Sequence, residues 1–406
     1  MRNIKIEVLW MLGALAAPQA LNFIFLILAT HSLEPHVFGQ VSYILLLSGL
    51  ISGISDIGTK DFFLTENAKK HSLGSGNFYL KLSSIGAFSC ISIMLISMIN
   101  SGSELEKRLA FIIIPEILAT SILSKKMLLF FQGQGNTTSF SRKESMIRVA
   151  SGSLRIIVFI ISGEVEYAIA ASSLMIIFAY AIWYIRNKKN QDSNFRKSKE
   201  TFKSFFKAWR HWYPYALINM AYLAYTSWDR VILKGQAGSE ALALYSAAFA
   251  FVAIGQLAAT AFWNVMMPKI IKSGRAFISK EELFAGLTLG FVTTVVYIIF
   301  AEFLFSIFFR FEYVEAKNIL IILSFYFLFR FVNVLLEAYL LSADRYVFFM
   351  RFRVLIAVVS IIGNFIFAGY YGSKATAAIF ACSEAILFVC LTIFSRDKPV
   401  NNVAAS

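Results

Sequence analysis

Long apolar segments follow one another along almost the whole chain, and short polar segments separate them. A helix needs about 20 apolar residues to cross the hydrocarbon layer of a membrane, and the apolar segments have roughly that length. We predict spans at residues 8–30, 39–57, 78–99, 109–131, 146–163, 167–186, 212–233, 241–264, 283–307, 316–341, 351–371 and 375–395. The pattern therefore predicts an all-α membrane protein with about 12 transmembrane helices.

The composition agrees with this pattern. Hydrophobic residues make up 58% of the 406 residues and charged residues 15%, whereas soluble domains have about 25% charged residues. The core of a soluble protein could not take up so much apolar surface, but lipid solvates it. We therefore expect the lipid bilayer to surround most of the chain.

The basic residues gather on one side of the predicted membrane, although the net charge of +14 would suggest nucleic acid binding in a soluble protein. With the N-terminus in the cytoplasm, the cytoplasmic gaps hold Lys60, Lys69, Lys70, Lys125, Lys126, Arg142, Lys143, Arg148, the basic residues of 186–210, Lys269, Lys272, Arg275, Lys280, Arg345, Arg351, Arg353, Arg396 and Lys398. The opposite gaps hold Lys107, Arg108, Lys234, Arg310, Lys317 and Lys374. Because cytoplasmic loops of membrane proteins are rich in Lys and Arg, we expect both termini in the cytoplasm and no nucleic acid partner.

The longest hydrophilic stretch divides the predicted spans into two halves. We predict an N-terminal six-helix lobe at 1–186, a basic cytoplasmic linker at 187–211 and a C-terminal six-helix lobe at 212–406. Both halves contain the pattern Pro-x-Ala-Leu, at 18–21 and at 214–217. Two related halves with an even number of spans share one orientation, which is typical of transporters.

Polar side chains inside the spans are the candidates for function. An ionisable side chain at mid-membrane costs about 2.5–3.5 kcal/mol, so it is retained where it meets a partner or an aqueous cavity. The cationic candidates are Arg155, Arg230 and Arg330, and the other candidates are Glu116, Asn219, Asp229, Asn333, Glu337 and Glu384. A guanidinium group binds phosphate or carboxylate through two parallel hydrogen bonds. The carboxylates can carry protons, or neutralise the arginines when no substrate is bound.

In the second half, helical spacing groups these candidates on two faces. Arg330, Asn333 and Glu337 share one face of their span, where a structural salt bridge and the lining of a cavity are both open interpretations. Most of the polar residues of 212–233 also share a face, namely Asn219, Tyr222, Thr226, Asp229 and Arg230. Asp229 and Arg230 lie toward the end of the span, where snorkelling to the interface is the alternative.

In the first half, a carboxylate and an arginine lie at similar depths of neighbouring spans. Glu116 and Arg155 are expected to pair across their helices, and Pro115 is expected to loosen the helix that carries Glu116. Lys125 and Lys126, near the inner end of the same span, are expected to snorkel.

Motifs for catalysis, metals and nucleotides are absent from the sequence. The cysteines Cys90, Cys382 and Cys390 form no CxxC pair, no HExxH spacing occurs, and no GxxxxGK[ST] run occurs. A membrane polymerase or ligase of glycans needs a sizeable outward loop, and each predicted outward loop has about ten residues or fewer. We therefore expect a protein that is not an enzyme, without cofactor, metal or catalytic residues.

Several short segments resemble the polysaccharide-biosynthesis transporters, the Wzx-type O-antigen flippases of the multidrug/oligosaccharidyl-lipid/polysaccharide exporter superfamily. Residues 22–63 resemble the first two spans of that family, with its loop at 33–39 and its span end at 55–58. The other segments are 130–136, which resembles the connection of the fourth and fifth spans, 229–233 and 243–248, which resemble the seventh and eighth, and Pro268 with Lys269. The order of these segments matches the family, and the short chain leaves out the extra spans of some relatives.

The resemblance implies two six-helix lobes around a central cavity that opens alternately to each side. It implies a flippase for undecaprenyl-diphosphate-linked oligosaccharide, such as an O-antigen repeat unit, in the bacterial cytoplasmic (inner) membrane. A polysaccharide polymerase and chain-length proteins are further candidate partners. Two alternatives are a multidrug-extrusion-type antiporter, whose cationic substrates favour an acidic lumen, and a lipid II flippase, which uses the same chemistry on another lipid.

Overall fold

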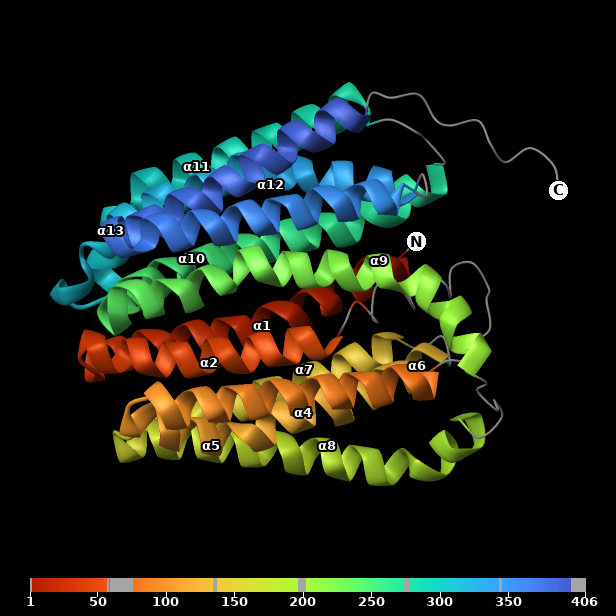
Figure 1. The fold of residues 1–406 in the computed structure, drawn as a ribbon, viewed down its shortest axis with the longest axis horizontal. Helices are drawn as coiled ribbons and strands as arrows, with labels where there is room; N and C mark the ends of the chain where they lie inside the picture. The colour runs from red at the N-terminus through yellow and green to blue at the C-terminus, as the bar shows by residue number, and fades with distance from the viewer. Residues whose placement is uncertain are drawn as a thin grey trace. The chain divides into compact units, whose positions relative to one another are not determined.

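The computed structural model describes residues 2–56, 58, 76–133, 137–195, 202–273, 278–342 and 345–395, which are helical apart from short turns (Figure 1). The helices are α1 (Arg2–Ser32), α2 (Pro35–Asp56), α4 (Gly76–Ser101), α5 (Glu104–Leu118), the π-helix η1 (Ala119–Ser124), α6 (Lys125–Gly133), α7 (Thr137–Ser162), α8 (Val165–Phe195), α9 (Phe202–Thr226), α10 (Trp228–Ser273), α11 (Lys280–Phe308), the 3₁₀ turn η2 (Phe311–Tyr313), α12 (Ala316–Ser342) and α13 (Tyr346–Ser395). No strand occurs among these residues, and the predicted all-α fold is confirmed.

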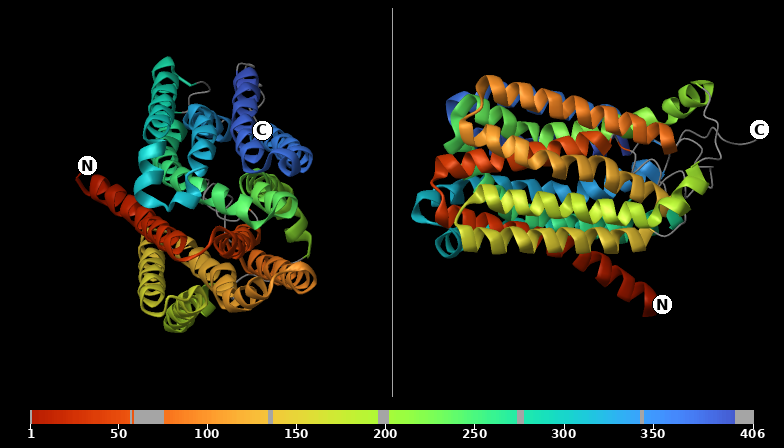
Figure 2. Two further views of the ribbon diagram at one scale, coloured as in Figure 1. Left: turned by 90° about the vertical axis from the view of Figure 1, so that its left-hand side faces the viewer. Right: turned by 90° about the horizontal axis from the view of Figure 1, so that it is seen from below.

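The chain forms two compact units, Met1–Leu223 and Ala224–Ser406. In unit 1, α7 packs against α1 and α8, and α5 packs against α2 and α8. In unit 2, α12 packs against α10, α11 and α13. Figure 2 shows that the helices within each unit run roughly along one direction, whereas the first turns of α1 project away from the other helices of unit 1. The predicted limits of the lobes and of the linker at 187–211 stay a prediction.

Two glycines allow the longest helical segments to reverse direction. Eight helical segments of the described residues are long and apolar enough to cross a membrane, and the two longest are Trp212–Trp263 and Val347–Ile393. Gly238 in α10 has φ 86° and Gly372 in α13 has φ 56°, a conformation that residues with a Cβ adopt rarely. The chain turns back within α10 and within α13 (Figure 1), and the two glycines interrupt the helical backbone in these segments, so that α13 supplies the two predicted spans 351–371 and 375–395.

The regular α-helix is interrupted within two predicted spans, and one interruption lies close to Pro115, which was expected to loosen its helix. Span 109–131 is divided into α5, η1 and α6, and the π-helical turn begins four residues after Pro115. Proline removes a backbone donor and its ring crowds the preceding turn, so a wider turn relieves the helix. Span 212–233 is divided at Ser227, where α9 ends and α10 begins.

A glycine contact fixes the distance between α11 and α12. A Cβ on Gly290 would lie 2.4 Å from the carbonyl oxygen of Phe327 and 3.0 Å from that of Leu328. Close approach of helices through small residues is a common packing mode in membranes.

We expect Gly290→Ala to push the two helices apart and to lower the free energy of unfolding by about 1–3 kcal/mol. Thermal unfolding of the purified protein measures this change. Gly235→Ala is the matched control, because a Cβ there meets nothing within 4 Å, and its effect should stay within about 0.5 kcal/mol. Equal stability of the two variants would contradict the tight contact.

Candidate functional site

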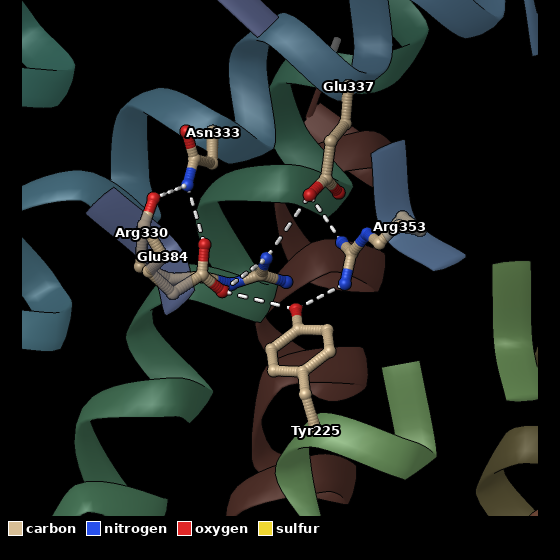
Figure 3. A network of polar contacts seen from close by, with 6 residues as sticks. All are labelled: Tyr225, Arg330, Asn333, Glu337, Arg353 and Glu384. Carbon is tan, nitrogen blue, oxygen red and sulfur yellow. Dashed lines mark hydrogen bonds and ion pairs between the residues drawn. The ribbon is translucent and has the colours of Figure 1, made fainter. Parts of the chain in front are cut away.

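Six polar side chains meet inside unit 2 (Figure 3). Arg330, Asn333 and Glu337 come from one face of α12, because their spacing of three and four residues matches the helical repeat. The other three are Tyr225 near the end of α9, Arg353 before the reversal of α13 and Glu384 after it. We call these six residues the unit 2 network. The packing of α12 against both arms of α13 thus brings together residues that lie far apart in the sequence.

Glu384 is the most buried acceptor of the network, with an exposed fraction of 0%. Its Oε2 accepts a hydrogen bond from Asn333 Nδ2 at 2.5 Å, and its Oε1 accepts one from Tyr225 Oη at 3.2 Å. Arg330 Nη1 lies 3.4 Å from the same Oε1. The carboxylate therefore has three donors, two from α12 and one from α9, which offset the cost of burying a polar group.

Glu337 joins the two arginines of the network. Its Oε1 accepts from Arg330 Nη1 at 3.3 Å and forms a short ion pair with Arg353 Nη2. Arg353 also donates to the Tyr225 hydroxyl, and only 3% of its surface is exposed. Two guanidinium groups thus face two carboxylates, so the network is neutral when all four groups are ionised.

The position of Arg353 in the structure differs from the position that the charge pattern predicts. The sequence placed it with the basic residues of a cytoplasmic gap, but the structure buries it in the unit 2 network. The sequence did contain a signal for this burial, because Ser360 and Asn364 follow Arg353 at seven and eleven residues, on the same helical face. Both are also buried, so α13 carries a polar face that the list of candidates missed.

Asp229 and Arg230 form a separate cluster in unit 2. Asp229 is 1% exposed, and it accepts from Tyr245 Oη and from the Arg230 backbone N–H, each at 2.8 Å. The Arg230 guanidinium donates to the Thr226 carbonyl at 3.0 Å and lies 4.3 Å from the centre of the Phe249 ring. Asp229 is therefore fixed by Tyr245 and by the backbone, and Arg230, whose Nε lies 3.9 Å from Asp229 Oδ1, also contacts backbone and an aromatic face.

Arg155 organises the polar centre of unit 1. Its Nη2 lies 3.3 Å from Glu116 Oε2, its Nε donates to Ser172 Oγ at 2.9 Å, and its Nη1 lies 3.4 Å from Asn22 Oδ1. Ser173 donates to the same Glu116 oxygen at 3.1 Å. The predicted pairing of Glu116 and Arg155 is confirmed, and four helices, α1, α5, α7 and α8, contribute to it.

Asn219 belongs with unit 1 rather than with Asp229. Its side-chain amide donates to the carbonyl of Gly53 in α2 at 3.2 Å, and the break at Ser227 separates it from the α10 residues. Asn219, Tyr222 and Thr226 share their predicted face within the helix α9, whereas Asp229 and Arg230 follow the break at Ser227 and belong to α10. The described residues contain no group of three His, Cys, Asp or Glu side chains that could hold a metal ion.

The arrangement of the helices is that of a class of multi-pass membrane transporters. The chain is similar to the lipid II flippase MurJ in an inward closed conformation, with a TM-score of 0.69 and 14% identity, over 95% of this chain and 87% of that chain. It is also similar to an inward-facing multidrug resistance MATE family transporter of the MOP superfamily, with a TM-score of 0.64 and 15% identity, over 95% and 97% of the two chains. A MOP superfamily transporter from Pyrococcus furiosus gives a TM-score of 0.63 at 11% identity, over 96% and 93%.

The chain belongs to the polysaccharide biosynthesis protein family, which it matches over residues 6–273. The capsular polysaccharide biosynthesis protein CapF of Staphylococcus aureus is 22% identical to it over 250 residues, which are 59% of this chain and 62% of that protein. The match thus spans less than two thirds of that relative. The family that the sequence segments resembled is confirmed.

Proposed function

We propose that this protein is a flippase that moves an undecaprenyl-diphosphate-linked oligosaccharide from the cytoplasmic to the outer leaflet by alternating access. The observation that carries the proposal is the unit 2 network, in which Arg330 and Arg353 lie at membrane depth in a chain of the polysaccharide biosynthesis family. Buried guanidinium groups are costly in a membrane protein and are typical of substrate pathways. A lipid-linked diphosphate is an anion that they suit.

The carboxylates of the network give the arginines a partner when no substrate is bound. Glu337 and Glu384 hold Arg330 at 3.3 and 3.4 Å, distances longer than the usual 2.7–2.9 Å or so of a strong charged hydrogen bond. A diphosphate oxygen competes for the same donors.

The polar centre around Arg155 in unit 1 resembles the unit 2 network, because it also joins a guanidinium group to a carboxylate and to neutral polar groups. Arg155 is held by one carboxylate and by neutral oxygens of Ser172 and Asn22, so an anion can replace the neutral partners without leaving Glu116 bare. Arg155, Arg230 and Arg330 are proposed as the substrate-binding cations, together with Arg353. The polar or proton-coupling groups of the cavity are proposed to be Glu116, Asp229, Asn219, Asn333, Glu337 and Glu384.

The positive charges of the proposed binding residues also bear on the two alternative functions, a multidrug antiporter and a lipid II flippase. A multidrug antiporter for cationic compounds would place its substrate beside guanidinium groups, which repel it. A lipid II flippase shares the diphosphate chemistry, so the sugar portion distinguishes it from the proposed function. The location in the bacterial cytoplasmic membrane, the cytoplasmic termini, and a polysaccharide polymerase with chain-length proteins as partners belong to the same proposal.

Deletion of the gene, with analysis of lipid-linked oligosaccharides on the two leaflets, tests the proposal. We expect the lipid-linked repeat unit to accumulate on the cytoplasmic leaflet and surface polysaccharide to disappear. Accumulation of lipid II instead would favour the peptidoglycan alternative. Unchanged lipid-linked saccharides, together with sensitivity to cationic dyes, would overturn the flippase in favour of the antiporter.

A further inference from the structure

One face of α7 carries a row of polar residues. Glu144, Arg148, Ser151 and Arg155 follow one another at steps of four, three and four residues, which places them on one side of the helix. The charge pattern places Arg148 in a cytoplasmic gap, but Glu144 and Arg148 both lie inside the candidate membrane span Ser139–Ser162. Arg155 is about 10 Å further along the helix axis than Arg148, since a helix rises about 1.5 Å per residue.

The exposed surface of Arg148 belongs to this polar face and not to the face of α7 that meets lipid. Its side chain is 47% exposed, whereas Ser151 and Arg155 are buried. The exposed apolar residues Met146 and Ile157 lie about half a turn around the helix axis from Arg148. Acyl chains therefore contact the opposite side of α7. A charged side chain at membrane depth that faces away from lipid is in contact with water.

The course of α1 explains why the polar face of α7 is open at Arg148. Further along α7, α1 covers this face, because a Cβ on Gly152 would lie 3.2 Å from Leu21 Cβ, and Phe25 meets the ring of Phe159 edge-on at 5.6 Å. Before Leu21, the α1 side chains at positions 16, 17, 19 and 20 are exposed. The first turns of α1 project away from the other helices of unit 1 (Figure 2), and they leave Arg148 uncovered.

Glu144 holds the exposed guanidinium group of Arg148 in one orientation. Its Oε1 accepts from Arg148 Nε at 3.2 Å and from Arg148 Nη2 at 2.9 Å. Ser124 Oγ of η1 and Tyr180 Oη of α8 lie 3.4 and 3.5 Å from the same oxygen. Two further helices thus fix the carboxylate. Arg148 Nη1 has no acceptor among the described residues, so its N–H donors remain for an anion.

We propose that Arg148 is a second binding residue of unit 1 for the diphosphate group of the transported lipid, on the cytoplasmic side of Arg155, with Glu144 as its positioning residue. This inference rests on the proposed flippase function. The positive-inside pattern predicts that α7 starts at the cytoplasmic side, so an entering headgroup reaches Arg148 before Arg155. The Nη1 edge offers a phosphate oxygen charge-assisted hydrogen bonds, and no packed side chain has to move for the anion to reach it.

The test measures the binding of farnesyl diphosphate, a short polyprenyl diphosphate, to the full-length protein in phosphatidylcholine nanodiscs by titration calorimetry. Arg148→Gln removes the cation. Glu144→Gln keeps an oxygen that positions Arg148 but removes the negative charge beside the phosphate. The controls are Arg108→Gln and Glu166→Gln, because these residues form an ion pair of similar exposure, 63% and 22% against 47% and 23%. Thermal unfolding of each variant checks that it is folded.

We expect Arg148→Gln to weaken the binding about tenfold, because charge-assisted hydrogen bonds are lost. Glu144→Gln should strengthen it about fivefold, because a like charge beside the phosphate is removed. The control variants should bind as the unaltered protein does. Weaker binding in both Arg148→Gln and Glu144→Gln would reveal a structural ion pair and overturn the proposal.

Two further outcomes separate this site from the proposed function. If Arg330→Ala loses binding while Arg148→Gln binds as the unaltered protein does, the Arg148 site is overturned and the flippase proposal stands. If the unaltered protein does not bind the diphosphate at all, both are overturned.

Discussion

Arg330→Ala is expected to lower surface polysaccharide at least about 100-fold while the amount of protein in the membrane stays near that of the unaltered chain. A guanidinium group that makes two charge-assisted hydrogen bonds to a diphosphate contributes about 3 kcal/mol or more, which corresponds to roughly that factor. The protein itself keeps most of its contacts. Glu337 retains Arg353, and Glu384 retains Asn333 and Tyr225.

Complementation of a deletion strain measures this loss, with immunoblots of membranes for the amount of protein. Arg155→Ala is expected to act in the same direction, and Arg310→Ala is the matched control, because Arg310 is exposed and pairs with an exposed Glu312. Normal surface polysaccharide in both the Arg330 and the Arg155 variants would refute the role of the buried cations in transport.

Glu337→Leu is expected to lower the free energy of unfolding by about 3–5 kcal/mol. Glu337 is the carboxylate that joins Arg330 to Arg353. Without it, Arg330 keeps Glu384, and Arg353 stays buried without the carboxylate of Glu337. Removing one partner of a buried pair costs this much because the other charge stays uncompensated.

The double variant Glu337→Leu/Arg353→Met separates this charge effect from packing. It removes one charge of each sign and leaves the Arg330–Glu384 pair, so we expect it to recover most of the stability. Glu337→Leu/Arg310→Met changes the same residue types but leaves Arg353 buried without the Glu337 carboxylate, and it should remain as unstable as the single variant. Thermal unfolding of the purified proteins compares the three. If the two double variants unfold alike, the Glu337–Arg353 ion pair does not contribute to stability.

The helical fold was predictable because hydropathy is a local property. Each predicted span needs only enough apolar residues in succession to cover the hydrocarbon layer, and the helices of the described chain lie at these segments. The chain reversals at Gly238 and Gly372 also leave a local signal, since glycine tolerates the positive φ that they require. The break at Ser227, between α9 and α10, leaves no comparable signal in the sequence.

The candidate site was predictable in part. Arg330, Asn333 and Glu337 share a face through the helical repeat alone, and Glu116 with Arg155 needed only complementary charge on neighbouring spans. Arg353 was missed because it stands near the start of a span, next to Arg351, in a segment that reads as a cytoplasmic gap. Its burial depends on α12 and α9, which cover that part of α13 with Glu337 and Tyr225.

The sequence by itself therefore determined the membrane-embedded helical fold, the family and most of the polar residues at membrane depth. Only the tertiary structure decided which of these residues meet. It balances Arg330 and Arg353 against Glu337 and Glu384, and it pairs Asp229 with Tyr245. The physical reason is that the cost of placing a charge in a membrane is set by its position along the chain. The partner that offsets this cost is set by distances between helices, and those distances depend on packing across the whole unit.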